Sequence, residues 1–158
     1  MPGITRKKFI AGAVVAGTAV CVCGFSSCAT FSKKGSTKAL DQGAYIIEKN
    51  ILKIELSKVP ALGMVGGAVK LTDGNLPQPI IIARTGDAEY AVVSIRCPHR
   101  GVEVEYKHGE KQFRCASLGH STFSTDGVFK KGLAKKSLAK YLAKLDPLDK
   151  NRLIVSLS

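Results

Sequence analysis

CPHRG at residues 97–101 and CASLGH at residues 115–120 carry the most specific signal in this chain. Each segment contains a cysteine, a histidine downstream of it and a glycine. Fifteen residues lie between His99 and Cys115. Thiolates and imidazoles are good ligands for transition metals, and glycine lets the backbone turn tightly. The pattern therefore indicates a metal site rather than a disulfide, and we call the two segments the metal-binding loops.

Short extended segments surround the two loops. Alternating or β-branched residues occupy residues 51–56, 79–83, 90–95, 102–106, 111–114 and 152–157. Turn signals separate several of them, including Gly-Asp at 86–87 and Asp-Gly at 126–127. This spacing favours an antiparallel all-β domain. Residues 134–145 fit helical and alternating patterns almost equally well, and we predict an extended conformation there.

The two loops resemble those of the Rieske family, which read Cys-x-His and Cys-x-x-His at this separation, each followed by glycine. The resemblance covers residues 44–158 and includes Phe123 and residues 126–127. It implies a small antiparallel Rieske-like β-sandwich with two cluster-binding loops and a [2Fe–2S] cluster. It further implies that Cys97 and Cys115 bind one iron, and that His99 and His120 bind the other.

Histidine ligands give such a cluster a distinct chemistry. Each neutral imidazole that replaces a thiolate removes one negative charge, so the cluster accepts an electron more readily than an all-cysteine cluster does. The outer ring nitrogen also titrates near neutral pH, which couples electron transfer to a proton.

The chain departs from the family pattern at several positions. Leu118 stands where the family has its second-loop histidine, and His120 follows two positions later. Quinol-oxidising members carry a bracing disulfide between the loops, but Val102 and Ser117 occupy the corresponding positions. The proline-containing segment that shields the cluster in those members is replaced by KGLA at residues 131–134. The lost disulfide predicts a reduction potential in the lower or middle part of the Rieske range.

The N-terminus has the features of an export signal. Three basic residues at positions 6–8 precede an uncharged apolar run over residues 9–25. We predict a signal peptide or membrane-anchor helix over residues 1–27 and a linker over residues 28–43. Small residues before Cys28 resemble a bacterial lipobox, which predicts lipidation of Cys28; an uncleaved spanning helix is the alternative. Residues 5–10 resemble a twin-arginine signal with lysine in the second position, so Tat and Sec export both remain open.

Composition limits the class of protein. The 158 residues suffice for one domain and a targeting segment. Residues 28–158 carry 21 Lys and Arg against 12 Asp and Glu, a formal charge of +9, which suits an acidic protein or an anionic membrane surface. No basic stripe interleaved with aromatic residues occurs, which argues against nucleic acid. Two cysteines after residue 28 are too few for a disulfide scaffold.

These observations predict an exported Rieske electron-transfer protein on the outer, periplasmic face of the cytoplasmic membrane. It would pass single electrons from a quinol or a partner oxidoreductase to a cytochrome-type acceptor. Two forms are open: the iron–sulfur subunit of a quinol–cytochrome c reductase, or a carrier for another oxidoreductase. A cluster-free binding or scaffold module and a zinc-binding Cys2His2 site are the alternatives. We do not expect an oxygenase, because the chain has no room for a second, mononuclear-iron domain.

Overall fold

The computed structural model describes residues 35–158. The predicted signal or anchor segment at residues 1–27 and the candidate lipidation site Cys28 lie outside the described residues. Within residues 35–158, no helix has both the length and the apolar character needed to cross a bilayer.

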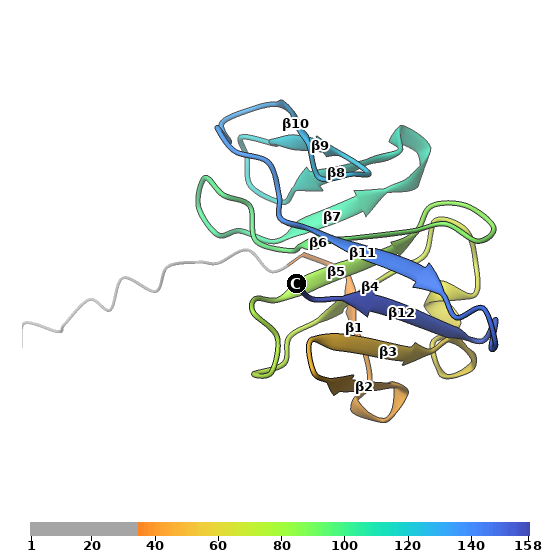
Figure 1. The fold of residues 1–158 in the computed structure, drawn as a ribbon. Coiled ribbons are helices and arrows are strands. Elements are labelled where there is room, and N and C mark those ends of the chain that lie inside the picture. Colours follow the sequence, from red (N-terminus) through yellow and green to blue (C-terminus); the bar gives the residue numbers. More distant parts are fainter. Residues whose placement is uncertain (1–34) are drawn as a thin grey trace, which may run out of the picture. The chain divides into compact units, whose positions relative to one another are not determined.

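Short strands joined by turns and single 3₁₀ turns build the described part (Figure 1). The strands are β1 (Lys38–Ala39), β2 (Tyr45–Glu48), β3 (Ile51–Glu55), β4 (Ala68–Leu71), β5 (Ile80–Arg84), β6 (Tyr90–Ser94), β7 (Val104–Lys107), β8 (Gln112–Cys115), β9 (Thr122–Ser124), β10 (Phe129–Lys131), β11 (Lys140–Leu145) and β12 (Arg152–Ser156). The 3₁₀ turns are η1 (Gln42–Ala44), η2 (Leu56–Lys58), η3 (Pro60–Leu62) and η4 (His108–Glu110). The predicted all-β class is confirmed, and so is the extended conformation of β11.

The strands pair into two sheets. The larger sheet has the order β1-β4-β5-β6-β11-β12-β3-β2, and the smaller has the order β10-β9-β8-β7. All pairs are antiparallel except β1 and β4, which run parallel. Figure 1 shows the smaller sheet lying against one end of the larger one. The smaller sheet and the loops beside it carry both metal-binding segments.

Strands β5 and β6 are buried on both faces. Ile80, Ile82 and Val92 belong to a core that the larger sheet encloses with residues from β3, β4 and β12. Ile81 and Val93 belong to a second core, shared with the smaller sheet. Alternate side chains of a strand point to opposite faces, so a strand with a core on each face needs apolar residues at consecutive positions. This requirement explains the sequences III at 80–82 and AVV at 91–93.

The chain immediately before β2 is attached to the domain. Strand β1 and the buried Leu40 fall within the segment that the sequence assigns to the linker. The backbone N–H of Gly35 donates to Glu103 Oε2 at 2.7 Å, and that of Ser36 donates to Glu105 Oε1 at 2.6 Å. The folded part therefore includes at least residues 35–43 of that segment.

Candidate metal centre

The first metal-binding loop connects β6 to β7. An antiparallel bridge between Arg96 and Glu103 forms its base. Inside the loop, the Cys97 N–H donates to the Val102 carbonyl at 2.8 Å, and the Gly101 N–H donates to the Cys97 carbonyl at 2.8 Å. Gly101 has a φ of 68°, a conformation that glycine adopts without strain. The predicted tight turn at Gly101 is confirmed.

The second metal-binding loop connects β8 to β9. The Cys115 N–H donates to the Ser121 carbonyl at 2.8 Å, and the His120 N–H donates to the Ser117 carbonyl at 3.0 Å. The Ala116 N–H donates across to the Glu103 carbonyl of the first loop at 3.0 Å. This last bond, together with the β7–β8 pairing, fixes the two loops side by side.

Three of the four predicted ligands converge where the loops meet. The ligand atoms of Cys97, His99 and Cys115 all lie within 4.8 Å of one another, and no other His, Cys, Asp or Glu of residues 35–158 joins this group. Cys97 Sγ lies 3.0 Å from His99 Nδ1. Both cysteines are free thiols and only 1% exposed, whereas the imidazole is half-buried.

Burial controls the electrostatics of the Cys97 thiol. It raises the pKa of the Cys97 thiol to about 11, although hydrogen bonds with the His99 backbone and the Ser121 side chain oppose the shift. A buried thiolate without a counter-charge is unfavourable, and a bound metal ion supplies that charge and deprotonates the thiol. Two buried thiols beside an imidazole therefore suit iron of the cluster type. The donor set fits a [2Fe–2S] cluster at three of its four positions.

The remaining histidines lie outside this group. His120 is exposed, and Leu118, at the family's histidine position, is 89% exposed. The assignment of His120 as the fourth ligand stays a prediction. His108 is also exposed, and its Nδ1 lies 3.4 Å from the Tyr106 hydroxyl, at the end of the β7–β8 hairpin away from the loops. His108 is therefore a surface residue away from the metal-binding loops.

In the second loop His120, and not Gly119, adopts a positive φ, which is 37°. Gly119 serves another purpose: a Cβ there would lie 2.5 Å from Leu133 Cδ1. The missing side chain at Gly119 therefore makes room for Leu133 to pack on the loop.

Two serines of the second loop were not recognised from the sequence. The Ser117 hydroxyl lies 3.2 Å from Cys115 Sγ and 3.5 Å from His99 Nε2. Ser121 is fully buried and accepts a hydrogen bond from the Ala134 N–H at 3.0 Å, and its side chain acts to lower the pKa of the Cys97 thiol. The sequence gives no signal that separates these serines from ordinary loop residues, because their role depends on tertiary contacts.

The segment KGLA at residues 131–134 packs on the second loop. A Cβ at Gly132 would lie 2.5 Å from Ser121 Cα, and the Ala134 N–H bonds to Ser121. By the resemblance to the Rieske family, this segment corresponds to the proline-containing shield of the quinol-oxidising members. The contacts show that it covers one side of the second loop.

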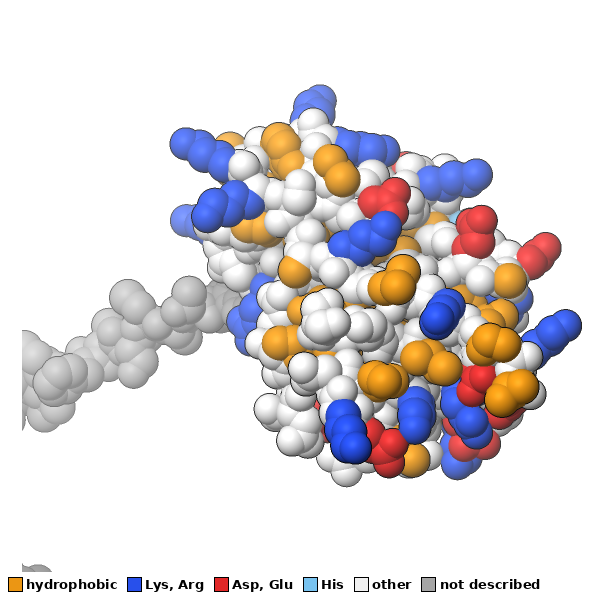
Figure 2. Space-filling model, in the orientation of Figure 1, with side chains coloured by type: hydrophobic (Ala, Val, Ile, Leu, Met, Phe, Trp, Pro, Cys, Tyr) orange, Lys and Arg blue, Asp and Glu red, His pale blue; other side chains and the backbone are white. Residues whose placement is uncertain are grey.

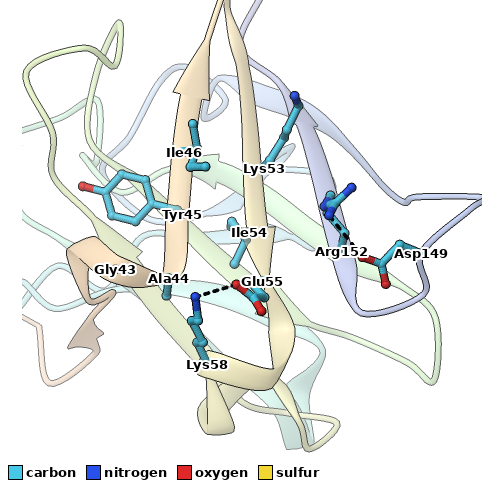
Figure 3. A pocket seen from close by; sticks show the side chains of 10 residues that line it. All are labelled: Gly43, Ala44, Tyr45, Ile46, Lys53, Ile54, Glu55, Lys58, Asp149 and Arg152. Atoms are coloured by element: carbon cyan, nitrogen blue, oxygen red, sulfur yellow. Dashed lines mark ion pairs between the residues drawn. The ribbon is translucent and has the colours of Figure 1, made fainter.

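One cavity lies away from the metal-binding loops. It has a volume of about 390 Å³ and lies over β2, β3 and β12 at the far edge of the larger sheet (Figure 3). Its charged residues form ion pairs, including Lys58 with Glu55 at 2.7 Å and Arg152 with Asp149 at 3.3 Å. None of the predicted metal ligands lines it.

Comparisons with known proteins agree with this assignment. No curated protein matches the sequence significantly. Among solved structures, the chain is similar to the plasma membrane Rieske protein PetC3 of the cyanobacterium Synechocystis PCC 6803, with 25% identity and a TM-score of 0.49. That match covers 62% of this chain and 93% of the other. The family model of the Rieske [2Fe–2S] domain matches residues 64–142, half of the 158-residue chain. With both metal-binding loops inside the matched region, this chain belongs to the Rieske family and its cofactor is a [2Fe–2S] cluster.

Proposed function

We propose that this protein is an exported, membrane-attached carrier that passes single electrons from a quinol or a partner oxidoreductase to a cytochrome. One observation carries the proposal: two buried thiols and a half-buried imidazole meet in two loops at an end of the domain. A bound [2Fe–2S] cluster supplies one-electron chemistry there. The partial exposure of His99 lets a partner approach the site from solvent.

The residues of the chain hold and shield the site. Burial of Cys97 and Cys115 keeps water away from the thiolates, and the Ala116–Glu103 hydrogen bond keeps the two loops together. The Ser117 and Ser121 hydroxyls lie where they can donate to the cysteine sulfurs. Such donors stabilise the sulfur charge that grows on reduction, and they raise the potential.

We place His120 at the fourth ligand position. It belongs to the same loop as Cys115, and no hydrogen bond within residues 35–158 holds its ring. Because the ring is exposed in the structure, ligation requires residues 118–120 to rearrange when the cluster binds. The competing donor is the Ser117 hydroxyl, which already lies next to Cys115 Sγ and His99.

Three single variants distinguish these ligand sets. His120→Ala should abolish the cluster spectrum, whereas Ser117→Ala should keep it with a changed potential. His108→Ala is the matched control and should leave both unchanged. If His120→Ala retains an unaltered spectrum while Ser117→Ala loses it, the serine hydroxyl is the ligand and the assignment of His120 is wrong.

The missing disulfide favours a carrier over a subunit of a quinol–cytochrome c reductase. In quinol-oxidising members the disulfide braces the cluster, but Val102 and Ser117 stand at those positions. Stopped-flow mixing of the full-length protein tests the function. The dithionite-reduced protein should transfer one electron to a c-type cytochrome, and the oxidised protein should accept an electron from a quinol or a reductase. A cluster that exchanges electrons with none of these would refute the proposal.

A further inference from the structure

Two exposed leucines stand next to the metal-binding site. Leu118 is 89% exposed and Leu133 is 65% exposed. They are neighbours because Leu133 packs against Gly119, the residue after Leu118. Both lie close to the ligands, since Leu118 is only three residues from Cys115. Large apolar side chains gathered in this way on a surface often mark a place where another protein binds.

Exposed cations surround these leucines. Lys130 and Lys131 precede Leu133, Lys135 and Lys136 follow it, and Arg100 belongs to the first loop. A hydrogen bond from the Phe129 N–H to the Ser137 hydroxyl, at 3.1 Å, closes the segment that carries the four lysines. We call these five cations the basic rim. Figure 2 shows blue side chains around orange ones on the upper left of the molecule, where Figure 1 places the loops beside the smaller sheet.

The charges of the basic rim are not neutralised within the domain. No carboxylate of residues 35–158 forms an ion pair with any of its five cations. Several cations elsewhere are paired, for example Lys70 with Glu103 at 2.8 Å and Lys140 with Asp126. An unpaired cluster of like charges creates a positive potential that attracts an anionic surface and speeds its association.

We propose that Leu118, Leu133 and the basic rim form the docking face for an acidic electron-transfer protein. The partner's matching face has an apolar centre and surrounding Asp and Glu side chains. The leucines provide the desolvated centre of the interface, and the cations orient the partner and set its rate of association. The inference rests on the proposed electron-transfer function, because it assigns the partner of the same site.

An anionic lipid surface is the alternative occupant of a face with leucines and lysines. The position of the basic rim argues against it. The rim flanks the loops that hold the ligands, so a membrane bound there would cover the site at which the carrier exchanges electrons. An acidic protein bound there is instead brought close to the ligands.

Stopped-flow kinetics of the full-length protein in neutral detergent tests the docking face. The probes are two soluble c-type cytochromes of matched potential, one acidic and one basic. The test variant is Lys135→Glu/Lys136→Glu. The control is Lys144→Glu/Lys150→Glu, at exposed lysines in and after β11 that form no ion pair in the described part.

The wild-type protein should react faster with the acidic cytochrome, and the rate constant should fall as ionic strength rises. The test variant should slow this reaction by roughly tenfold or more and reverse the preference, while the control changes it little. Equal rates for test and control variants, or a wild-type preference for the basic cytochrome, would overturn the proposal. Surface plasmon resonance measures the binding of the acidic cytochrome to the same face, even in protein that carries no cluster. It therefore separates a failure of docking from a failure of the proposed electron transfer.

A vesicle experiment separates the lipid alternative. The full-length protein is reconstituted into neutral vesicles and into vesicles with anionic phosphatidylglycerol. If the face binds protein, the ratio of the wild-type rate to the test-variant rate with the acidic cytochrome should be the same in both kinds of vesicle. If anionic vesicles suppress the wild-type rate and the test variant restores it, the face lies on lipid and the proposal is wrong.

Discussion

Replacing Gly132 by alanine tests the contact that holds the second metal-binding loop. Gly132 has a φ of 115°, which L-residues rarely adopt. An added Cβ would lie 2.5 Å from Ser121 Cα and 2.9 Å from Ser121 N. The clash is therefore with backbone atoms, which cannot rotate away as a flexible side chain would.

Two costs add at this position. A non-glycine residue in a disfavoured backbone conformation costs about 1–3 kcal/mol. Overpacking of a tight contact costs about 1–3 kcal/mol more. The free energy of unfolding should therefore fall by about 2–6 kcal/mol, a large part of the roughly 5–15 kcal/mol that stabilises an ordinary domain. Ser121 must also shift, which weakens the hydrogen bond from the Cys115 N–H to the Ser121 carbonyl, so cluster occupancy should fall.

Guanidinium unfolding followed by far-UV circular dichroism measures the first effect, and iron content measures the second. Gly109→Ala is the matched control, because a Cβ there meets nothing within 4 Å and its φ is not positive. The reasoning is refuted if Gly132→Ala unfolds within about 0.5 kcal/mol of the wild-type protein, the range of ordinary surface substitutions, and retains its iron.

Three further outcomes are expected. Cys28→Ala should release the protein from the membrane or trap its precursor if a lipid anchors it; unchanged retention with an intact N-terminus would favour a spanning helix. Lys107 and the Ser36 N–H lower the pKa of Glu105 to about 2 from 4.5, so this carboxylate stabilises the fold above pH 4.5 and its contribution is lost as the pH falls towards 2. Glu105→Gln should remove that part of the pH dependence of the unfolding midpoint. An unchanged pH profile of the variant would contradict this assignment. Without the bracing disulfide, the reduction potential should lie in the lower or middle part of the Rieske range of roughly −150 to +300 mV. Ser121→Ala should lower the potential further. If protein-film voltammetry finds a potential near the upper limit, other hydrogen-bond donors compensate and the prediction is wrong.

Local sequence patterns predicted most of the strands and the first loop. Alternation and β-branching located β3, β5, β6 and β12 because the side chains that face each core are set by the strand period. The convergence of Cys97, His99 and Cys115 was implied by the resemblance of the two loops to those of the Rieske family. These features depend on residues that lie close together in the chain.

Features that depend on long-range contacts were not predicted. Strand β6 pairs with β11, and β1 pairs with β4 in parallel. The sequence of each of these strands does not identify the strand with which it pairs. Residues 35–36 were predicted to lie in a linker, but their hydrogen bonds to Glu103 and Glu105 attach them to the domain. The buried Ser121 could not be recognised for the same reason.

Metal analysis of the full-length protein tests the central claim most directly. We expect about two irons and two acid-labile sulfides per chain, and an electron paramagnetic resonance signal of the Rieske type after reduction. Zinc bound stoichiometrically without iron would contradict the account and support a Cys2His2 zinc site. A colourless, metal-free protein that is nonetheless folded would contradict it as well, and would indicate a scaffold module built on the same fold.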